Sequence, residues 1–98
     1  MTLPVVMRVQ ARAEFDEAFD WYEQQRTGLG VEFMEQVQAV FDQISAMPEL
    51  HPAVYRDVRK ALVRNFPYSV FYRVGTGRVI VLAVFHNKRN PVVWRSRA

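Results

Sequence analysis

The feature that most constrains the fold is that the spacing of apolar residues changes twice along the chain. Apolar and polar residues alternate over residues 5–10, which predicts a short strand. From residue 11 to about residue 47, apolar residues recur every three or four positions, as they do on one face of a helix. Alternation returns after residue 54 and continues to residue 86. A chain with this order must pack a helical layer against a sheet.

The helical part is divided by the glycine-containing sequence TGLG at residues 27–30. Glycine readily takes the left-handed conformation found at helix ends, so a first helix over residues 11–26 should stop here. A second apolar stripe predicts a helix from residue 31 to about residue 47, followed by Pro48. Because the connection is short, we expect the two helices to form an antiparallel hairpin.

Three strands are expected in the second half of the chain, over residues 54–63, 66–74 and 78–86. The sequence GTG at residues 75–77 predicts a tight turn between the last two. The last strand is apolar on both faces, as is typical of a central strand. The sequence therefore predicts an α+β fold with the order β-α-α-β-β-β, a two-helix hairpin on a mostly antiparallel sheet, as one domain over residues 1–98.

Charge is divided unevenly between the two halves of the chain. Residues 1–50 carry nine acidic and three basic side chains, a formal charge of −6. Residues 51–98 carry one acidic and ten basic side chains, a formal charge of +9. A field of one sign over half a small domain predicts an anionic partner, either nucleic acid or an acidic protein. The alternative is a domain with uneven charge and no such partner.

Several classes of protein find no support in the sequence. The chain has no cysteine, which excludes disulfides and zinc–thiolate sites and is compatible with the cytoplasm. No signal peptide is recognisable, and no apolar stretch reaches the roughly 18 residues of a membrane-spanning helix. Glycine-rich nucleotide motifs are absent, and two distant histidines make a weak metal site, so we expect no cofactor and no metal.

The basic residues of the second half are candidates for binding a partner. If Val58 and Leu62 of the strand over residues 54–63 packed inward, Lys60 and Arg64 would follow them, so this face cannot be wholly buried. Strand twist or a bulge must bring these cations to a groove or an edge. These cations could form a surface that binds phosphate or carboxylate groups. Alternatively, they protect an edge strand from aggregation. The candidates for contacts with a partner are Arg56, Arg59, Lys60, Arg64, Arg73, Lys88, Arg89, Trp94, Arg95 and Arg97.

His86, at the end of the last strand, is a candidate general acid or base because the ordinary pKa of histidine lies near neutrality. No acidic residue follows Asp57, so any carboxylate that orients His86 must come from the helices. A lone histidine at a strand end is more often structural. We therefore expect the positive charge of the segment from residue 86 to residue 97 to be functional and the His86 side chain to be structural.

Three motifs occur in series along nearly the whole chain. The first lies in the helical hairpin and consists of WYEQQ, GLG and a following phenylalanine. The second is FPYSVFYRV at residues 66–74, and the third is the ending AVFHNKRNPVVWRSR at residues 83–97. In this order they resemble the ParE/RelE superfamily, which comprises toxins of bacterial type II toxin–antitoxin systems, often labelled plasmid stabilization proteins. The resemblance implies the same β-α-α-β-β-β fold.

The resemblance leaves two activities open. RelE-like members are ribosome-dependent mRNA endonucleases, and ParE-like members poison DNA gyrase. RelE-type nucleases carry an arginine directly after the residue that matches Tyr68, where it would stabilise charge on the scissile phosphate. This chain has Ser69 there, and Trp94 falls near their C-terminal tyrosine. If this chain is a metal-independent nuclease, its catalytic residues would have to be Lys60, Arg64, His86 and Arg89.

The ParE-like branch requires no catalytic set. The resemblance then implies a cytoplasmic toxin that inhibits DNA gyrase when free and is neutralised by a co-encoded acidic antitoxin in a hetero-oligomer. The positive half of the chain supplies a physical reason for such a partner, since complementary charge speeds association. The alternatives are an endonuclease that acts on the ribosome and mRNA, and a non-toxic binding module with the same fold.

Overall fold

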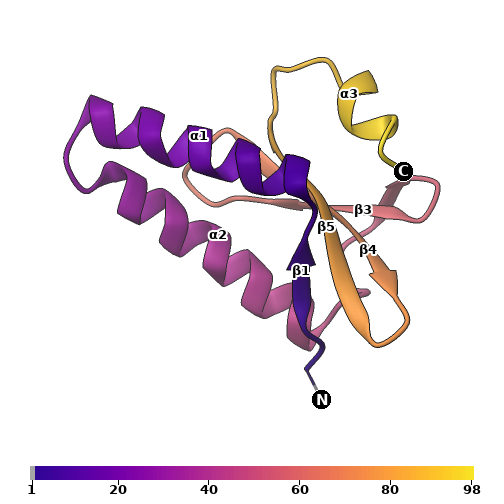
Figure 1. Ribbon diagram of the computed structural model, residues 1–98. Helices are drawn as coiled ribbons and strands as arrows, with labels where there is room; N and C mark the ends of the chain where they lie inside the picture. The colour runs from indigo at the N-terminus through magenta and orange to yellow at the C-terminus, as the bar shows by residue number, and fades with distance from the viewer. Residues whose placement is uncertain (1) are drawn as a thin grey trace.

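The computed structural model describes residues 2–98, which form one sheet, two long helices and a short third helix (Figure 1). The elements in chain order are β1 (Val5–Met7), α1 (Val9–Gln25), α2 (Leu29–Ala46), β2 (Ala53–Tyr55), β3 (Val58–Leu62), β4 (Tyr68–Gly75), β5 (Arg78–His86) and α3 (Val92–Arg95). The expected α+β class and the helical hairpin are confirmed.

The five strands are ordered β1-β5-β4-β3-β2 across the sheet. β1 pairs with β5 in parallel, and all other neighbours are antiparallel. α1 and α2 lie side by side on one face of the sheet, and α3 lies against the opposite face, which we call the outer face (Figure 1). Among residues 2–98, no helix is long and apolar enough to cross a membrane.

The first strand is shorter than the alternation of its residues predicted. It ends at Met7, and α1 begins at Val9, where a strand to residue 10 was expected. The N–H of Arg12 donates to the carbonyl oxygen of Arg8 at 3.0 Å, which starts the helical hydrogen-bond pattern. Val9 continues the alternation in sequence, but its side chain is 83% exposed on the first turn of the helix.

The single strand predicted over residues 54–63 is wrong, because the chain turns back at Arg56 and Asp57. β2 and β3 form a tight antiparallel hairpin in which Tyr55 pairs with Val58. Arg56 adopts a φ of 53°, in the left-handed region that residues other than glycine seldom enter. The turn contains no glycine or proline from which it could have been predicted. As a result the sheet has five strands, one more than expected.

β5 contains a β-bulge, which changes the face of the sheet to which its following side chains point. Phe71 of β4 pairs with Ala83 of β5. The next residue, Tyr72, pairs with Val81, so Leu82 is an extra residue with no partner on β4. The residues on either side of the bulge exchange faces, and β5 contributes to the helix-side core and to the outer-face core.

Glu23 joins the two long helices by capping the start of α2. Its carboxylate accepts hydrogen bonds from the N–H groups of Gly28 (3.1 Å), Gly30 (2.8 Å) and Val31 (3.2 Å). These bonds hold the pKa of the Glu23 carboxyl below its ordinary value, and the bond from Gly28 makes the largest contribution to this shift. The helices approach closely here because residue 30 is glycine: a Cβ would lie 2.7 Å from the carbonyl oxygen of Phe19.

Replacing Glu23 with glutamine is expected to reduce the pH dependence of stability. Because the folded pKa is lowered, the carboxylate stabilises the fold above its unfolded pKa, and this contribution is lost as pH falls through the folded value. Urea unfolding should show that the free energy of unfolding falls less between neutral and acidic pH for Glu23→Gln than for the wild type. The control is Glu35→Gln on the exposed side of α2. Equal pH dependence in wild type and Glu23→Gln would contradict the cap.

Candidate functional site

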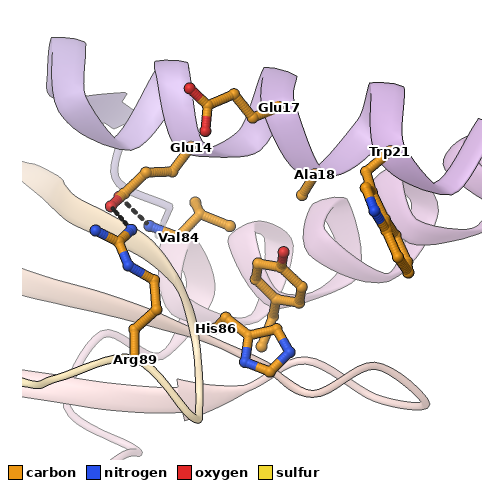
Figure 2. A pocket seen from close by; sticks show the side chains of 8 residues that line it. Glu14, Glu17, Ala18, Trp21, Val84, His86 and Arg89 are labelled. Atoms are coloured by element: carbon orange, nitrogen blue, oxygen red, sulfur yellow. Dashed lines mark hydrogen bonds and ion pairs between the residues drawn. The ribbon is translucent and has the colours of Figure 1, made fainter.

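Two clefts flank the segment that follows β5. One opens on the outer face, with a volume of about 260 Å³, and we call it the basic cleft. The residues of its lining that carry charge or aromatic rings are Lys60, Phe71, Phe85, Arg89, Trp94 and Arg95. The other, of about 220 Å³, lies between α1 and the sheet, and we call it the helix-side cleft (Figure 2). His86 and Arg89 line both clefts.

The floor of the basic cleft is a set of stacked aromatic rings on the outer face. Trp94 of α3 stacks on Phe71 of β4, with ring centroids 4.0 Å apart and an interplanar angle of 18°. Phe85 of β5 meets Phe71 edge-on at 6.3 Å. These side chains are only 2–5% exposed. The short helix α3, which the sequence analysis did not predict, therefore acts as a cover for this part of the sheet.

Three cations lie over the rings of this floor. Lys60 Nζ lies 5.9 Å from the ring centroid of Phe71 and Arg89 Cζ lies 4.4 Å from that of Phe85. Arg95 Cζ lies 5.6 Å from the ring centroid of Trp94. Within residues 2–98, neither Lys60 nor Arg95 forms an ion pair with an acidic side chain. Cation–π contacts hold these side chains in place, and their N–H groups remain available to an anion.

Glu14 of α1 occupies the edge of β5 where β1 ends. β1 pairs with β5 only as far as Val81, so beyond it the edge of β5 that faces away from β4 has no neighbouring strand. The N–H of Val84 donates to Glu14 Oε1 at 3.2 Å, as Figure 2 shows. Arg97 Nη1 donates to the carbonyl oxygen of Leu82 at 3.1 Å. Two side chains thus take the place of a continued strand.

The same carboxylate fastens the C-terminal segment to α1. Arg97 forms a bidentate pair with Glu14, with N–O distances of 2.9 and 3.1 Å. Arg89 Nη1 lies 3.2 Å from the second carboxylate oxygen (Figure 2). The side chains of Glu14 and Arg97 are 12% and 14% exposed, so the pair is largely removed from water. We call Glu14, Arg89 and Arg97 the Glu14 cluster.

His86 is held by its own loop and by an aromatic neighbour. Its Nδ1 accepts a hydrogen bond from the backbone N–H of Lys88 at 3.1 Å, and its ring meets Tyr68 edge-on at 5.1 Å. No carboxylate within residues 2–98 hydrogen-bonds to His86, although Glu14 and Glu17 line the same cleft. Burial raises the pKa of the Tyr68 phenol, which is therefore neutral at pH 7.

Ser69 occupies the position that RelE-type nucleases fill with arginine. Its side chain is fully buried, and its hydroxyl donates to Asn87 Oδ1 at 2.6 Å. This bond fastens the loop after β5 to β4. The chain therefore uses the position to fix the loop, and it places no charge there.

The four candidates for nuclease chemistry are only partly brought together. Lys60, His86 and Arg89 line the basic cleft, whereas Arg64 is not part of its lining. Within the described part of the chain, no group of three or more histidine, aspartate or glutamate side chains could hold a metal ion.

The remaining candidates for partner contacts have different surroundings. Arg95 joins Lys60 and Arg89 in the basic cleft, whereas Arg64 and Lys88 are exposed elsewhere on the surface. Arg56 is exposed and lies 5.1 Å from the ring of Tyr55.

Four candidates have partners inside the chain. Arg59 donates to the carbonyl oxygen of His51 at 2.6 Å and so holds the loop before β2. Arg73 pairs with Asp57 at 3.0 Å. Trp94 is 4% exposed, and Arg97 is engaged by Glu14. Trp94 and Arg97 are therefore largely removed from solvent.

Glu14 and the aromatic floor were missed by the sequence analysis. Glu14 looked like one of several acids on the exposed side of a helix, and nothing local distinguishes it from Glu17. Phe71 and Phe85 occupy alternating positions of strands and could have been assigned to the face opposite the helices. Only the bulge at Leu82, which shifts the pairing of the two strands, places Phe85 of β5 on the same face of the sheet as Phe71 of β4.

Comparison with known proteins agrees with this fold. No curated protein matches the chain. A solved structure described as the chromosomal ParDE TA system from P. aeruginosa aligns with a TM-score of 0.76 and 15% sequence identity, over 87% of this chain and 96% of that one. The family described as the ParE toxin of type II toxin–antitoxin systems, parDE, matches residues 5–91. As its three motifs predicted, the chain belongs to this ParE toxin family.

Proposed function

We propose that this protein, when free, inhibits DNA gyrase in the bacterial cytoplasm and is neutralised by a co-encoded acidic antitoxin. The basic cleft is the observation that carries the proposal. It presents cations without acidic partners on a rigid aromatic floor. A rigid, charged surface of this kind suits a protein that acts by binding a large target, because little conformational entropy is lost on association.

The residues at the positions of the nuclease groups favour binding over catalysis. Ser69 provides no positive charge for a developing oxyanion, and its hydroxyl is committed to Asn87. Partial burial raises the pKa of the Tyr68 phenol, which makes it a poorer source of a phenolate base at pH 7. Trp94 has no phenol that could take a proton from, or give one to, a ribose hydroxyl. An inhibitor that traps its target by surface contact needs none of these groups.

A second candidate function has one specific observation in its favour. Lys60, His86 and Arg89 line the same cleft, so two cations and an imidazole could act on one phosphodiester. This is the arrangement expected of a ribosome-dependent mRNA endonuclease. Arg64 lies outside the lining, which leaves the set incomplete.

Tightly controlled expression in bacteria separates the two candidates. Gyrase inhibition predicts filamentous cells and induction of the DNA-damage response, with bulk mRNA intact. The nuclease predicts rapid loss of translated mRNA before any damage response. Co-expression of the adjacent antitoxin gene should restore growth in either case. Normal growth without antitoxin would contradict both activities in that host.

A further inference from the structure

The basic cleft differs from the rest of the basic surface because its cations converge on one place. Lys60 reaches it from β3, Arg89 from the loop after β5, and Arg95 from α3. Arg89 also contacts Glu14, but Lys60 and Arg95 have no acidic partner among residues 2–98. Three segments that are distant in sequence thus bring positive charges to one cleft, and among residues 2–98 no acidic side chain lines it.

The aromatic rings below these cations are not available for stacking. Phe71, Phe85 and Trp94 are 5%, 2% and 4% exposed, since they cover one another and lie beneath the cations. Proteins that bind single-stranded nucleic acid offer open aromatic faces on which bases stack. The basic cleft offers N–H donors above covered rings, which suits a compact anionic group without a base.

One exposed aliphatic side chain lines the cleft, and two others are exposed on β3 and α3, which also contribute residues to its lining. Val54 forms part of its lining and is 45% exposed. Leu62 follows Lys60 on the same side of β3 and is 66% exposed, and Val92 on α3 is 59% exposed. Exposed aliphatic groups beside a charged centre are typical of protein-binding surfaces. They would gain little from the sugar–phosphate backbone of a nucleic acid.

We propose that the basic cleft binds the carboxylate of an acidic side chain, with neighbouring aliphatic side chains of the same peptide segment packing on its rim. The segment belongs to the antitoxin, so this inference rests on the proposed function and specifies how its neutralising partner is recognised. The carboxylate accepts hydrogen bonds from the N–H groups of Lys60 and Arg95, while the aliphatic side chains of the rim add buried apolar area to the interface.

The test is a fluorescence anisotropy titration with a short labelled peptide in which glutamate alternates with leucine. The same peptide with glutamine in place of glutamate tests the charge, and oligouridylate of equal length tests the nucleic-acid alternative. Lys60→Gln and Arg95→Gln remove one charge each and retain most of the side-chain stem. Arg78→Gln, at the opposite end of β5, is the matched control.

Each of the two cleft variants is expected to weaken binding of the glutamate peptide about tenfold, and Arg78→Gln by less than about twofold. The glutamine peptide should bind at least about tenfold more weakly than the glutamate peptide. Unchanged affinity in both cleft variants, or tighter binding of oligouridylate that displaces the peptide, would overturn the proposal. Unfolding midpoints measured in parallel separate lost binding from lost folding.

The same variants distinguish this inference from the gyrase proposal. Lys60→Gln combined with Arg95→Gln should retain less co-purified antitoxin than the wild type. If the wild type leaves gyrase unaffected but binds antitoxin through the cleft, the gyrase proposal fails and the inference stands. If the double variant retains antitoxin fully while the wild type inhibits gyrase, the inference fails and the proposed function stands.

Discussion

Replacing Glu14 with alanine is expected to lower the free energy of unfolding by about 2–4 kcal/mol. The substitution removes the acceptor for two arginines and for the N–H of Val84. Arg97 would then be a largely buried guanidinium without a counter-charge, which is costly because the pair is shielded from water. For a chain of this size, the melting temperature should fall by about 10–20 °C.

Urea unfolding followed by circular dichroism measures this loss. Glu17→Ala is the matched control, because Glu17 lies on the same helix, is exposed and has no ion pair among residues 2–98. It should change stability by less than about 0.5 kcal/mol. A double-mutant cycle with Arg97→Ala isolates the energy of the pair. A coupling energy near zero would show that the Glu14 cluster does not hold the C-terminal segment.

Replacing Trp94 with alanine is expected to cost about 3–5 kcal/mol, the usual loss for a large buried aromatic side chain. Trp94 is 4% exposed and stacks on Phe71 at 4.0 Å, so its removal leaves a cavity over the sheet. α3 has four residues and cannot be stable without this anchor. The basic cleft should therefore be lost together with the outer-face core.

Trp21→Ala provides the same chemical change at a residue that is 56% exposed, and it should cost no more than about 1 kcal/mol. Hydrogen exchange should show faster exchange in the C-terminal segment of Trp94→Ala, with α1 and α2 less affected. Trp94→Phe retains a ring for stacking and should fold even if Trp94→Ala does not. Equal stability of Trp94→Ala and wild type would mean that the cover is dispensable.

The helical hairpin and the last strand could be predicted because their signals are local. Helices expected over residues 11–26 and 31–47 are observed at Val9–Gln25 and Leu29–Ala46, and the strand expected over residues 78–86 is observed as Arg78–His86. The hairpin turn at Arg56 and the bulge at Leu82 arise from strand pairing. Neither has a glycine or proline signature, so neither could be predicted from neighbouring residues.

The charge of the site could be predicted, but its organisation could not. The basic second half of the chain contains Lys60, Arg89 and Arg95, which line one cleft in the structure. Which cations remain unpaired depends on Glu14, which lies 83 residues before its partner Arg97. Alternation along β4 does not reveal that Phe71 lies beneath Trp94, because that contact depends on how α3 folds back onto the sheet.

A supercoiling assay with purified toxin and purified DNA gyrase tests the central claim most directly. The proposed function predicts that stoichiometric toxin inhibits supercoiling and increases the amount of cleaved DNA, and that prior mixing with the antitoxin restores activity. Trp94→Ala, if folded, should inhibit less because the basic cleft is disturbed. Full gyrase activity in excess wild-type toxin, with mRNA cleaved by the same preparation in translating ribosomes, would contradict the proposal.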